Sequence, residues 1–210
     1  MTAVTAAAAD RRLATALPSL LAIAAGVLTV AAYAPFGAPG LAVVTLALLF
    51  GLWYSDETPR AAARTGFAFG IGLFGAGISW VYIALETFGG MAAPLAALAT
   101  GGLVLFLSLY PALAGFVAVR LTPAGTARRA IAAAAAFVLA EWLRGFLFTG
   151  FPWLAVGYSQ LPGSPLAGYA PVGGVWLASL AVALVAALVV LAVDAFVTGR
   201  TRAGVFATAG

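Results

Sequence analysis

The stretch AIAAAAAFVLAEWLRGFLFTGFPWLAVGYSQ, residues 130–160, contains the two features on which the fold depends. Its first eleven residues are all apolar, as expected of a helix that is buried or lies in a membrane. The next twenty contain a glutamate, an arginine, a proline and a glutamine. A fold proposed for this chain has to explain why polar groups and a helix breaker gather at one place.

The whole chain has the composition of an integral membrane protein. Of its 210 residues, 64% are hydrophobic and 8% are charged, and the mean hydropathy is +1.12. Soluble domains carry about 25% charged residues, so a single water-soluble core is excluded. The chain has no Cys, His or Lys, which excludes disulfides, thiol or histidine catalysis and the usual transition-metal sites. We therefore expect no metal and no cofactor.

Long uncharged runs predict an all-α, polytopic transmembrane helical bundle of about six spans. The first run could also be the core of a cleaved secretory signal, but at 21 residues it exceeds the usual core of about 7–15. Breaker sequences such as APFGAPG, ETFGGM and RLTPAGTARR separate the runs. The predicted spans are 13–33, 38–54, 66–85, 92–119, 130–148 and 166–193.

The distribution of arginine predicts how the bundle is oriented. With six spans, nine of the ten arginines lie on the side of the two termini, and Arg144 alone lies near the other. Positive loops stay in the cytoplasm, so both termini are predicted to be cytoplasmic. This placement also explains the pI of about 10.0 without a nucleic-acid partner. The predicted organisation is a cytoplasmic tail (1–12), a transmembrane domain (13–197) and a second tail or truncated continuation (198–210).

The outer half is predicted to be the working face. Four of the five tryptophans fall in it: Trp80, Trp142, Trp153 and Trp176. The third span is rich in glycine, and the helical repeat places Gly66, Gly70 and Gly77 on one face with Gly72 and Gly75 opposite. Such small-residue faces serve mainly for helix packing. Glu86, just beyond this span, is a candidate site residue or a solvated loop charge.

Glu141 and Arg144 are predicted to lie inside the membrane. Glu141 is 12 residues beyond Arg129, roughly 18 Å along the helix. A lone charge at that depth costs about 2.5–3.5 kcal/mol, and residues three apart share a helix face and can pair. Two interpretations remain open. The pair is a structural element of the bundle interior, or Arg144 keeps donors free for the phosphate of a lipid headgroup.

Pro152 predicts that the helix ends before Phe151. Non-helical backbone at membrane depth has to be buried in protein or line a wet cavity. The turn at Gly150–Trp153 therefore predicts a polar pocket that opens to the outer leaflet. This pocket accounts for the polar groups of the opening stretch.

These same residues carry a family resemblance. Five motifs, found between about residues 33 and 174 and in the order that the family has them, resemble the apolipoprotein N-acyltransferases of bacterial inner membranes. They are AYAPFG, FGIGLFGAGISWVYIALETFGGM, FLSLYPALAGFV, LRGFLFTGFPWLAVGYSQ and PLAGYAPVGGV. The resemblance implies transfer of an acyl chain from a phospholipid to the N-terminal diacylglyceryl-cysteine of an apolipoprotein. In that family a Cys, Glu and Lys triad in an external nitrilase-like domain makes the bond. A chain without Cys or Lys is not expected to hold that triad.

The resemblance implies that this chain is the membrane part of such an enzyme, with the nitrilase-like domain missing or separate. Its predicted role is access for lipid and lipoprotein at the periplasmic face. Trp153 is the first candidate for a substrate contact, with an interfacial anchor as the plain alternative. A small stand-alone transporter or permease subunit is the alternative function, and a non-catalytic scaffold is a third. The residues predicted to line the access site are Trp153, Pro152, Phe151, Gly150, Arg144, Glu141, Tyr158, Gln160 and Glu86.

Overall fold

A computed structural model describes residues 2–161 and 163–199, and in these residues every regular element is a helix. The prediction of an all-α fold is therefore confirmed. The predicted C-terminal tail lies outside the described residues except for Thr198 and Gly199. The elements are α1 (Thr2–Val30), α2 (Gly40–Ser55), α3 (Pro59–Gly77), α4 (Trp80–Ile83), η1 (Ala84–Phe88), α5 (Ala93–Leu121), α6 (Ala127–Arg144), η2 (Leu147–Thr149), η3 (Val156–Gln160), η4 (Pro165–Tyr169) and α7 (Ala170–Val197).

Two of the helices begin at a capping threonine. The Thr58 hydroxyl accepts a hydrogen bond from Ala61 N at 3.3 Å, and Pro59 occupies the first turn of α3. Thr126 caps α6 in the same way, accepting from Arg129 N at 3.3 Å. The third predicted span is not one straight helix, because α3 and the α4–η1 segment are bent by 48° at a short break.

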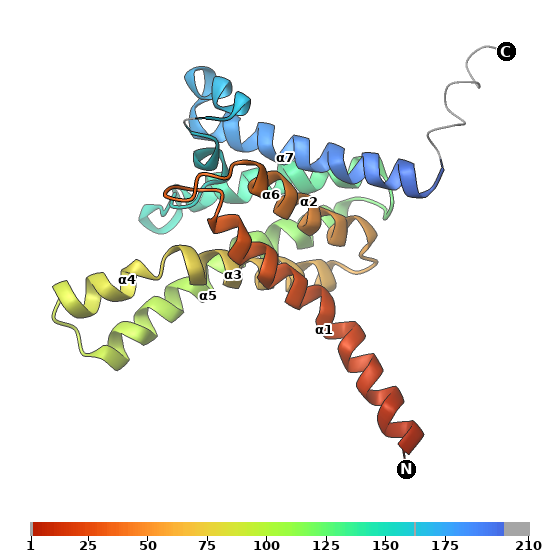
Figure 1. Cartoon of the computed structure of the whole chain (residues 1–210), viewed down its shortest axis with the longest axis horizontal. Coiled ribbons are helices and arrows are strands. Elements are labelled where there is room, and N and C mark those ends of the chain that lie inside the picture. Colours follow the sequence, from red (N-terminus) through yellow and green to blue (C-terminus); the bar gives the residue numbers. More distant parts are fainter. Residues whose placement is uncertain (1, 162, 200–210) are drawn as a thin grey trace.

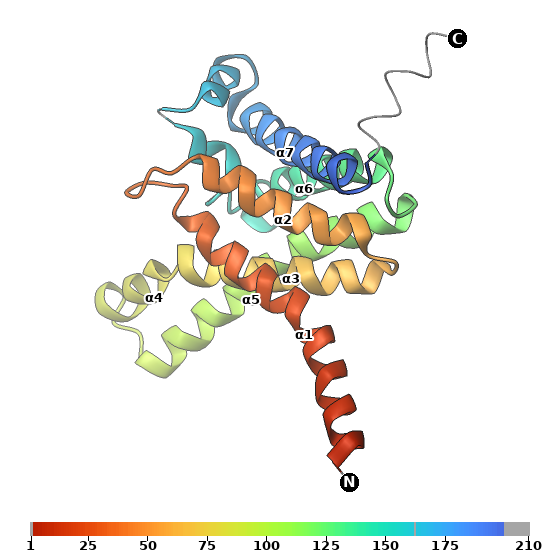
Figure 2. The same cartoon turned by 45° about the vertical axis from the view of Figure 1, so that its right-hand side comes forward.

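Figures 1 and 2 show that the chain runs back and forth between two ends of the bundle. The connections at 31–39 and 145–169 lie at one end, with the α4–α5 hairpin projecting from it. The short turns at 56–58 and 122–126 lie at the other end. This alternation matches the predicted order of loops.

The core forms where α2, α3 and α6 meet. Phe50 lies 5.6 Å from Trp53 and 5.8 Å from Phe137, and Phe69 lies 6.3 Å from Phe137, all between ring centroids. Around this cluster α3 makes its most extensive contacts with α5 and α1, while α7 packs on α6 and α2. The glycine-rich helix α3 thus packs against two long helices, α5 and α1, as its small-residue faces predict.

By length and composition, two described helices could cross a membrane: Ala93–Leu121 and Pro165–Val197. The bent pair Pro59–Gly77 and Trp80–Phe88 could be a third. By length and composition, the described helices therefore provide fewer than the six predicted membrane spans. α2 has only 16 residues, about 24 Å against a hydrocarbon layer of about 30 Å. α6 contains Arg128, Arg129, Glu141 and Arg144, which lower its hydropathy.

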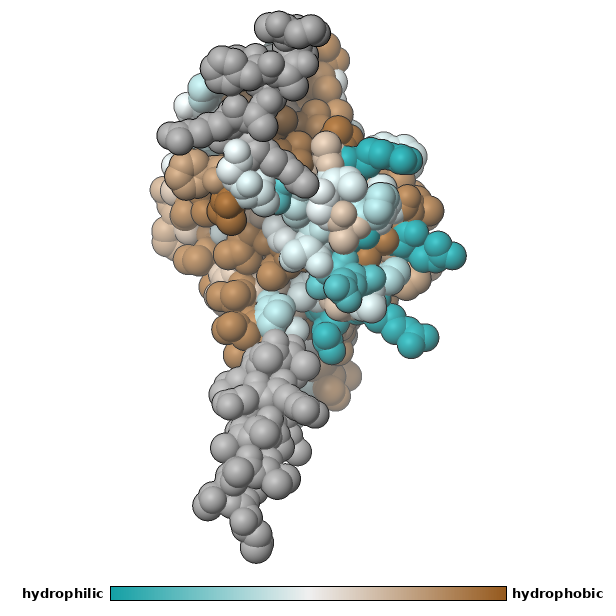
Figure 3. All heavy atoms as spheres, turned by 90° about the vertical axis from the view of Figure 1, so that its right-hand side faces the viewer, coloured by the Kyte–Doolittle hydropathy of each residue, from teal (hydrophilic) through white to brown (hydrophobic). Residues whose placement is uncertain are grey.

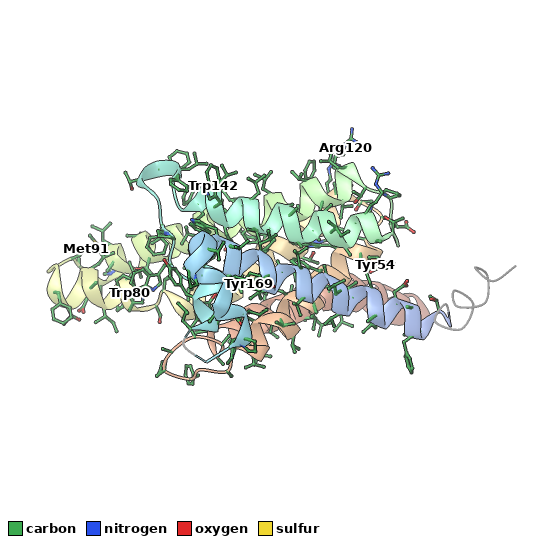
Figure 4. The ribbon with its side chains drawn as sticks, turned by 90° about the horizontal axis from the view of Figure 1, so that it is seen from above. Tyr54, Trp80, Met91, Arg120, Trp142 and Tyr169 are labelled. Carbon is green, nitrogen blue, oxygen red and sulfur yellow. The ribbon has the colours of Figure 1, made fainter. Side chains whose placement is uncertain are left out.

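One end of the bundle is polar while its sides are apolar. Figure 3 shows hydrophilic residues gathered on the end that holds the short turns, with hydrophobic surface beside them. The side chains of Arg60, Arg64, Arg120 and Arg128 are exposed, and Figure 4 shows Arg120 at this end, opposite Met91. Arg129 differs, because its side chain is buried and donates to the carbonyls of Trp53, Asp56, Val119 and Thr122.

Candidate functional site at the end of α6

The end of α6 leads into a strained turn. Gly145 N closes the helix by donating to Glu141 O at 3.1 Å and Trp142 O at 2.9 Å. The chain then folds back, so that Phe151 N donates to Arg144 O at 2.8 Å. Phe148, Thr149 and Leu154 have φ values of 54°, 74° and 59°, the only positive ones at non-glycine positions among the described residues. Backbone of this kind persists only where surrounding contacts hold it.

Arg144 holds the backbone on the C-terminal side of this turn. Its Nη1 donates to Phe151 O at 2.6 Å and to Trp153 O at 2.5 Å. The guanidinium carbon lies 5.1 Å from the centroid of the Phe74 ring, and the residue is 2% exposed. The cation therefore anchors the backbone on both sides of Pro152. This geometry favours the structural interpretation of Arg144 over headgroup binding.

Glu141 holds the next part of the same segment. Its Oε1 accepts from Val156 N at 2.9 Å and lies 3.9 Å from Arg144 Nη2. The predicted pairing of Glu141 with Arg144 is thus present, and both side chains face the bundle interior. Because each residue also bonds to backbone, the pair connects α6 to the beginning of η3.

Residues distant in sequence complete the support of this segment. The Tyr33 hydroxyl donates to Leu154 O at 2.8 Å. Gln160 Nε2 donates to Pro39 O at 3.3 Å and to Ser159 Oγ at 2.7 Å. Gly157 N donates to Ser179 Oγ at 2.8 Å, and a Cβ at Gly157 would lie 2.2 Å from Val175 O. The segment 151–160 is therefore bonded to the 31–39 connection, α6 and α7.

The predicted aromatic residues lie on the outer side of this scaffold. Trp153 is 52% exposed and Tyr158 is 47% exposed, while Pro152 is exposed and Phe151 is half-buried. The Trp153 ring centroid lies 5.4 Å from that of Trp80 and 6.4 Å from that of Phe151. Figure 4 shows Trp80 at the base of the projecting hairpin. Exposed aromatic rings thus stand on backbone that buried bonds hold in place.

A cavity of about 150 Å³ lies beside the turn and reaches Arg144. Phe106 forms part of its wall, and its ring lies 5.5 Å from Phe148 and 5.8 Å from Tyr110 between centroids. The lining is mostly apolar with one buried cation at its base: Leu103, Phe106, Leu107, Tyr110, Arg144, Leu147, Phe148, Thr149, Gly150 and Phe151.

Eight of the nine predicted residues belong to this one region, from Glu141 to Gln160. Glu86 does not, because it lies in η1, which packs on α4 and α5. Its Oε2 accepts a hydrogen bond from Thr87 Oγ1 at 2.6 Å. The structure does not bring Glu86 together with the other predicted residues.

Sequence reasoning missed several residues that support or surround this site. Tyr33 and Tyr110 stand within the quoted motifs AYAPFG and FLSLYPALAGFV, so the resemblance could have marked them. Ser179 stands in an ordinary apolar run and carries no such signal. In the described part of the chain, no group of three or more His, Cys, Asp or Glu residues is placed to hold a metal.

Comparison with known proteins shows which family this chain resembles. Residues 25–188 match the family model for the apolipoprotein N-acyltransferase N-terminal domain. The chain is 54% identical over 169 residues to the apolipoprotein N-acyltransferase of Nitrosomonas europaea, covering 80% of this chain and 34% of that protein. It is 47% identical over 174 residues to that of Azotobacter vinelandii, covering 82% and 33%.

The chain thus spans about a third of the length of these relatives. The matched region includes the end of α6, the turn and η3, which together form the site described above. The chain belongs to the apolipoprotein N-acyltransferase family and corresponds to its N-terminal domain.

Proposed function

We propose that this chain is the membrane domain of an apolipoprotein N-acyltransferase in the bacterial inner membrane. It crosses the membrane six times with both termini in the cytoplasm. Its end with the 31–39 and 145–169 connections faces the periplasm and admits phospholipid and apolipoprotein. The family membership and the gathering of exposed arginines at the opposite end support this proposal.

The six-span topology is compatible with the charged residues of α6. Charged groups within membranes face the bundle interior and pair with one another or with carbonyls. Glu141, Arg144 and Arg129 are 5%, 2% and 3% exposed, and all three bond to backbone. α6 therefore presents little charge to lipid along its length, despite its low hydropathy.

Acyl transfer itself belongs to a nitrilase-like domain that is separate from these residues. Covalent acyl transfer requires an activated nucleophile, and a chain without Cys or Lys lacks the family's triad. We expect this 210-residue chain alone to transfer no acyl group from phospholipid to a diacylated lipoprotein. Turnover by the isolated chain would contradict this division of roles.

One observation carries the access role: exposed aromatic rings stand on rigidly bonded, non-helical backbone beside an apolar cavity. Trp153 is half exposed although its carbonyl is bonded to Arg144. Indole offers a broad apolar face and one donor, which suits an acyl chain next to a polar headgroup. The polar groups also lie toward one end, which favours lipid access over transport across the midplane.

Trp153→Ala in the full-length enzyme tests this role. We expect kcat/KM for acylation of a diacylated lipoprotein to fall by about tenfold, because an aromatic contact of about 1.5 kcal/mol corresponds to that ratio. The midpoint of thermal unfolding should change little, since the side chain is half exposed.

Trp142→Ala is the matched control. Trp142 is 43% exposed on α6, and its ring lies tilted against that of Phe146, at 4.9 Å between centroids. In Figure 4 it lies away from Trp80. Equal losses of activity in the two variants would assign Trp153 to general membrane anchoring instead.

A further inference from the structure

The side chains of Glu141 and Arg144 lie too far apart for a direct hydrogen bond. Their closest approach is 3.9 Å, whereas N–H···O bonds fall between about 2.7 and 3.2 Å. Arg144 uses Nη1 for two backbone carbonyls, and Glu141 uses Oε1 for Val156 N. The other carboxylate oxygen, Glu141 Oε2, is buried and has no hydrogen-bond partner among the described residues.

The geometry around Oε2 is unusual for a buried carboxylate. A buried acceptor without a partner costs about 1–3 kcal/mol, and more when it is charged. The Ser179 hydroxyl accepts the bond from Gly157 N and lies near the carboxylate, but it makes no hydrogen bond of ordinary length to Oε2. A polar contact longer than about 3.5 Å beside an unpaired oxygen is where a bridging water is expected.

A cavity of the right size adjoins the pair. It offers about 10 Å³ to the centre of a water-sized sphere. One water-sized sphere occupies about 10–15 Å³, so this space suits a single water molecule. Its polar lining comes from Glu141, Arg144 and Tyr110, and the phenol group of Tyr110 is near enough to Arg144 to interact electrostatically. The remaining lining is Phe69, Leu73, Phe74, Pro111, Phe137 and Ala140.

We propose that this cavity is a binding site for one ordered water molecule that bridges Glu141 Oε2 and Arg144 Nη2. The water accepts a hydrogen bond from the guanidinium and donates one to the carboxylate. A bridging water explains why Glu141 and Arg144 lie 3.9 Å apart, why Glu141 Oε2 has no partner among the described residues, and why a cavity adjoins the pair. Buried waters make about three hydrogen bonds, and Tyr110 supplies a further polar group.

The water completes the support of the turn. It joins the residue that holds Phe151 and Trp153 to the residue that holds Val156. The larger cavity of about 150 Å³ shares Arg144 and Tyr110 with this site, so the two cavities lie next to each other. This inference goes beyond the proposed function and holds whether or not the chain admits lipid.

A high-resolution experimental structure of the full-length protein tests the site without any variant. We expect one isolated density peak within about 3.2 Å of both Glu141 Oε2 and Arg144 Nη2. An empty cavity would overturn the proposal. So would a Glu141 side chain turned to bond Arg144 directly.

Two substitutions sharpen the test. In Glu141→Gln the density should persist, because the amide keeps a polar atom at the position of Oε2. In Glu141→Leu it should vanish, because the cavity loses its acceptor. Density that remains in Glu141→Leu, or disappears in Glu141→Gln, would contradict the bridge. The readout is structural, so its failure is distinct from a failure of the acyltransferase assay.

Discussion

At the residue scale, α6 carries a buried arginine near each end, and both hold non-helical backbone. Arg129 donates to carbonyls of the 53–56 and 119–122 segments, and Arg144 to those of Phe151 and Trp153. The planar guanidinium can reach several carbonyls at once, which an ammonium group does less well. Arg129 was counted among the loop charges that set orientation, but its burial gives it a structural role as well.

Arg144→Met should destabilise the folded protein by about 3–5 kcal/mol, because it leaves Glu141 as an unpaired buried charge and two carbonyls without their donor. Thermal unfolding in detergent measures the effect. Adding Glu141→Gln to Arg144→Met should recover part of the lost stability, because it removes the unpaired negative charge.

Arg120→Met is the control for this prediction. Arg120 is exposed at the opposite end of the bundle, so its loss should change stability by no more than about 0.5 kcal/mol. A similar loss in Arg120→Met and Arg144→Met would mean that the buried bonds contribute no more than a surface charge.

Asp56 predicts a pH dependence of stability. Burial raises the pKa of its carboxyl above the ordinary 3.8, and the attraction of Arg64 and Arg129 only partly opposes this. The folded state therefore binds the proton more tightly than the unfolded chain. The protonated Asp56 carboxyl therefore stabilises the fold. This contribution is fully present below pH 3.8 and is lost as the pH rises through the pKa that Asp56 has in the folded state.

Asp56→Asn should remove this contribution. Unfolding midpoints measured from about pH 4 to pH 7 should fall less steeply for the variant than for the wild type. Parallel curves would show that Asp56 does not cause the dependence.

At the element scale, Gly66, Gly70 and Gly72 of α3 divide between two neighbouring helices as the helical repeat predicts, whereas Gly77 faces the side chain of Leu154. A Cβ at Gly66 would lie 2.3 Å from Pro111 O, and one at Gly70 would lie 2.6 Å from Ser108 Cα, so this face packs on α5. A Cβ at Gly72 would lie 2.1 Å from Ile23 O of α1. Gly75 meets nothing within 4 Å, so helix packing does not explain it.

Gly70→Ala and Gly75→Ala form a matched pair in one helix. Gly70→Ala should destabilise the bundle by about 1–3 kcal/mol, because its methyl group would overlap the backbone of α5. Gly75→Ala should be neutral or stabilising by up to about 1 kcal/mol, because alanine favours helix and the space is open. Unfolding midpoints decide between these outcomes, and equal losses would contradict the close approach of α3 and α5.

At the scale of the whole molecule, the two ends of the bundle differ in construction. One end has short turns and exposed arginines, whereas the other has long connections, strained backbone and exposed aromatic rings. Figures 1 and 2 show these connections at opposite ends in both views. This difference supports the proposed orientation, with the arginine end in the cytoplasm.

Because this 210-residue chain contains no cysteine, single cysteines introduced into it test this orientation directly. Thr87 and Leu161 are exposed toward the proposed periplasm, and Ala124 is exposed in the 122–126 turn. In intact cells an impermeant thiol reagent should label Thr87→Cys and Leu161→Cys. It should label Ala124→Cys only after lysis. Labelling of Ala124→Cys in intact cells would overturn the proposed topology.

The sequence by itself determined the helical membrane class, the approximate helix positions, the family, and the region that contains most of the candidate site. Hydropathy, helix breakers and motifs are local properties, and each can be read within a short window. The number of crossings was harder to predict, because α2 is short and α6 is charged.

Only the tertiary structure decided what those site residues do. Tyr33 and Leu154, like Pro39 and Gln160, are 121 residues apart and are joined by hydrogen bonds to backbone carbonyls. Every residue has a carbonyl, so no residue type marks its carbonyl as an acceptor. For the same reason, sequence could place Glu141 and Arg144 on one helix face, but only the folded chain shows that they hold the turn beneath Trp153.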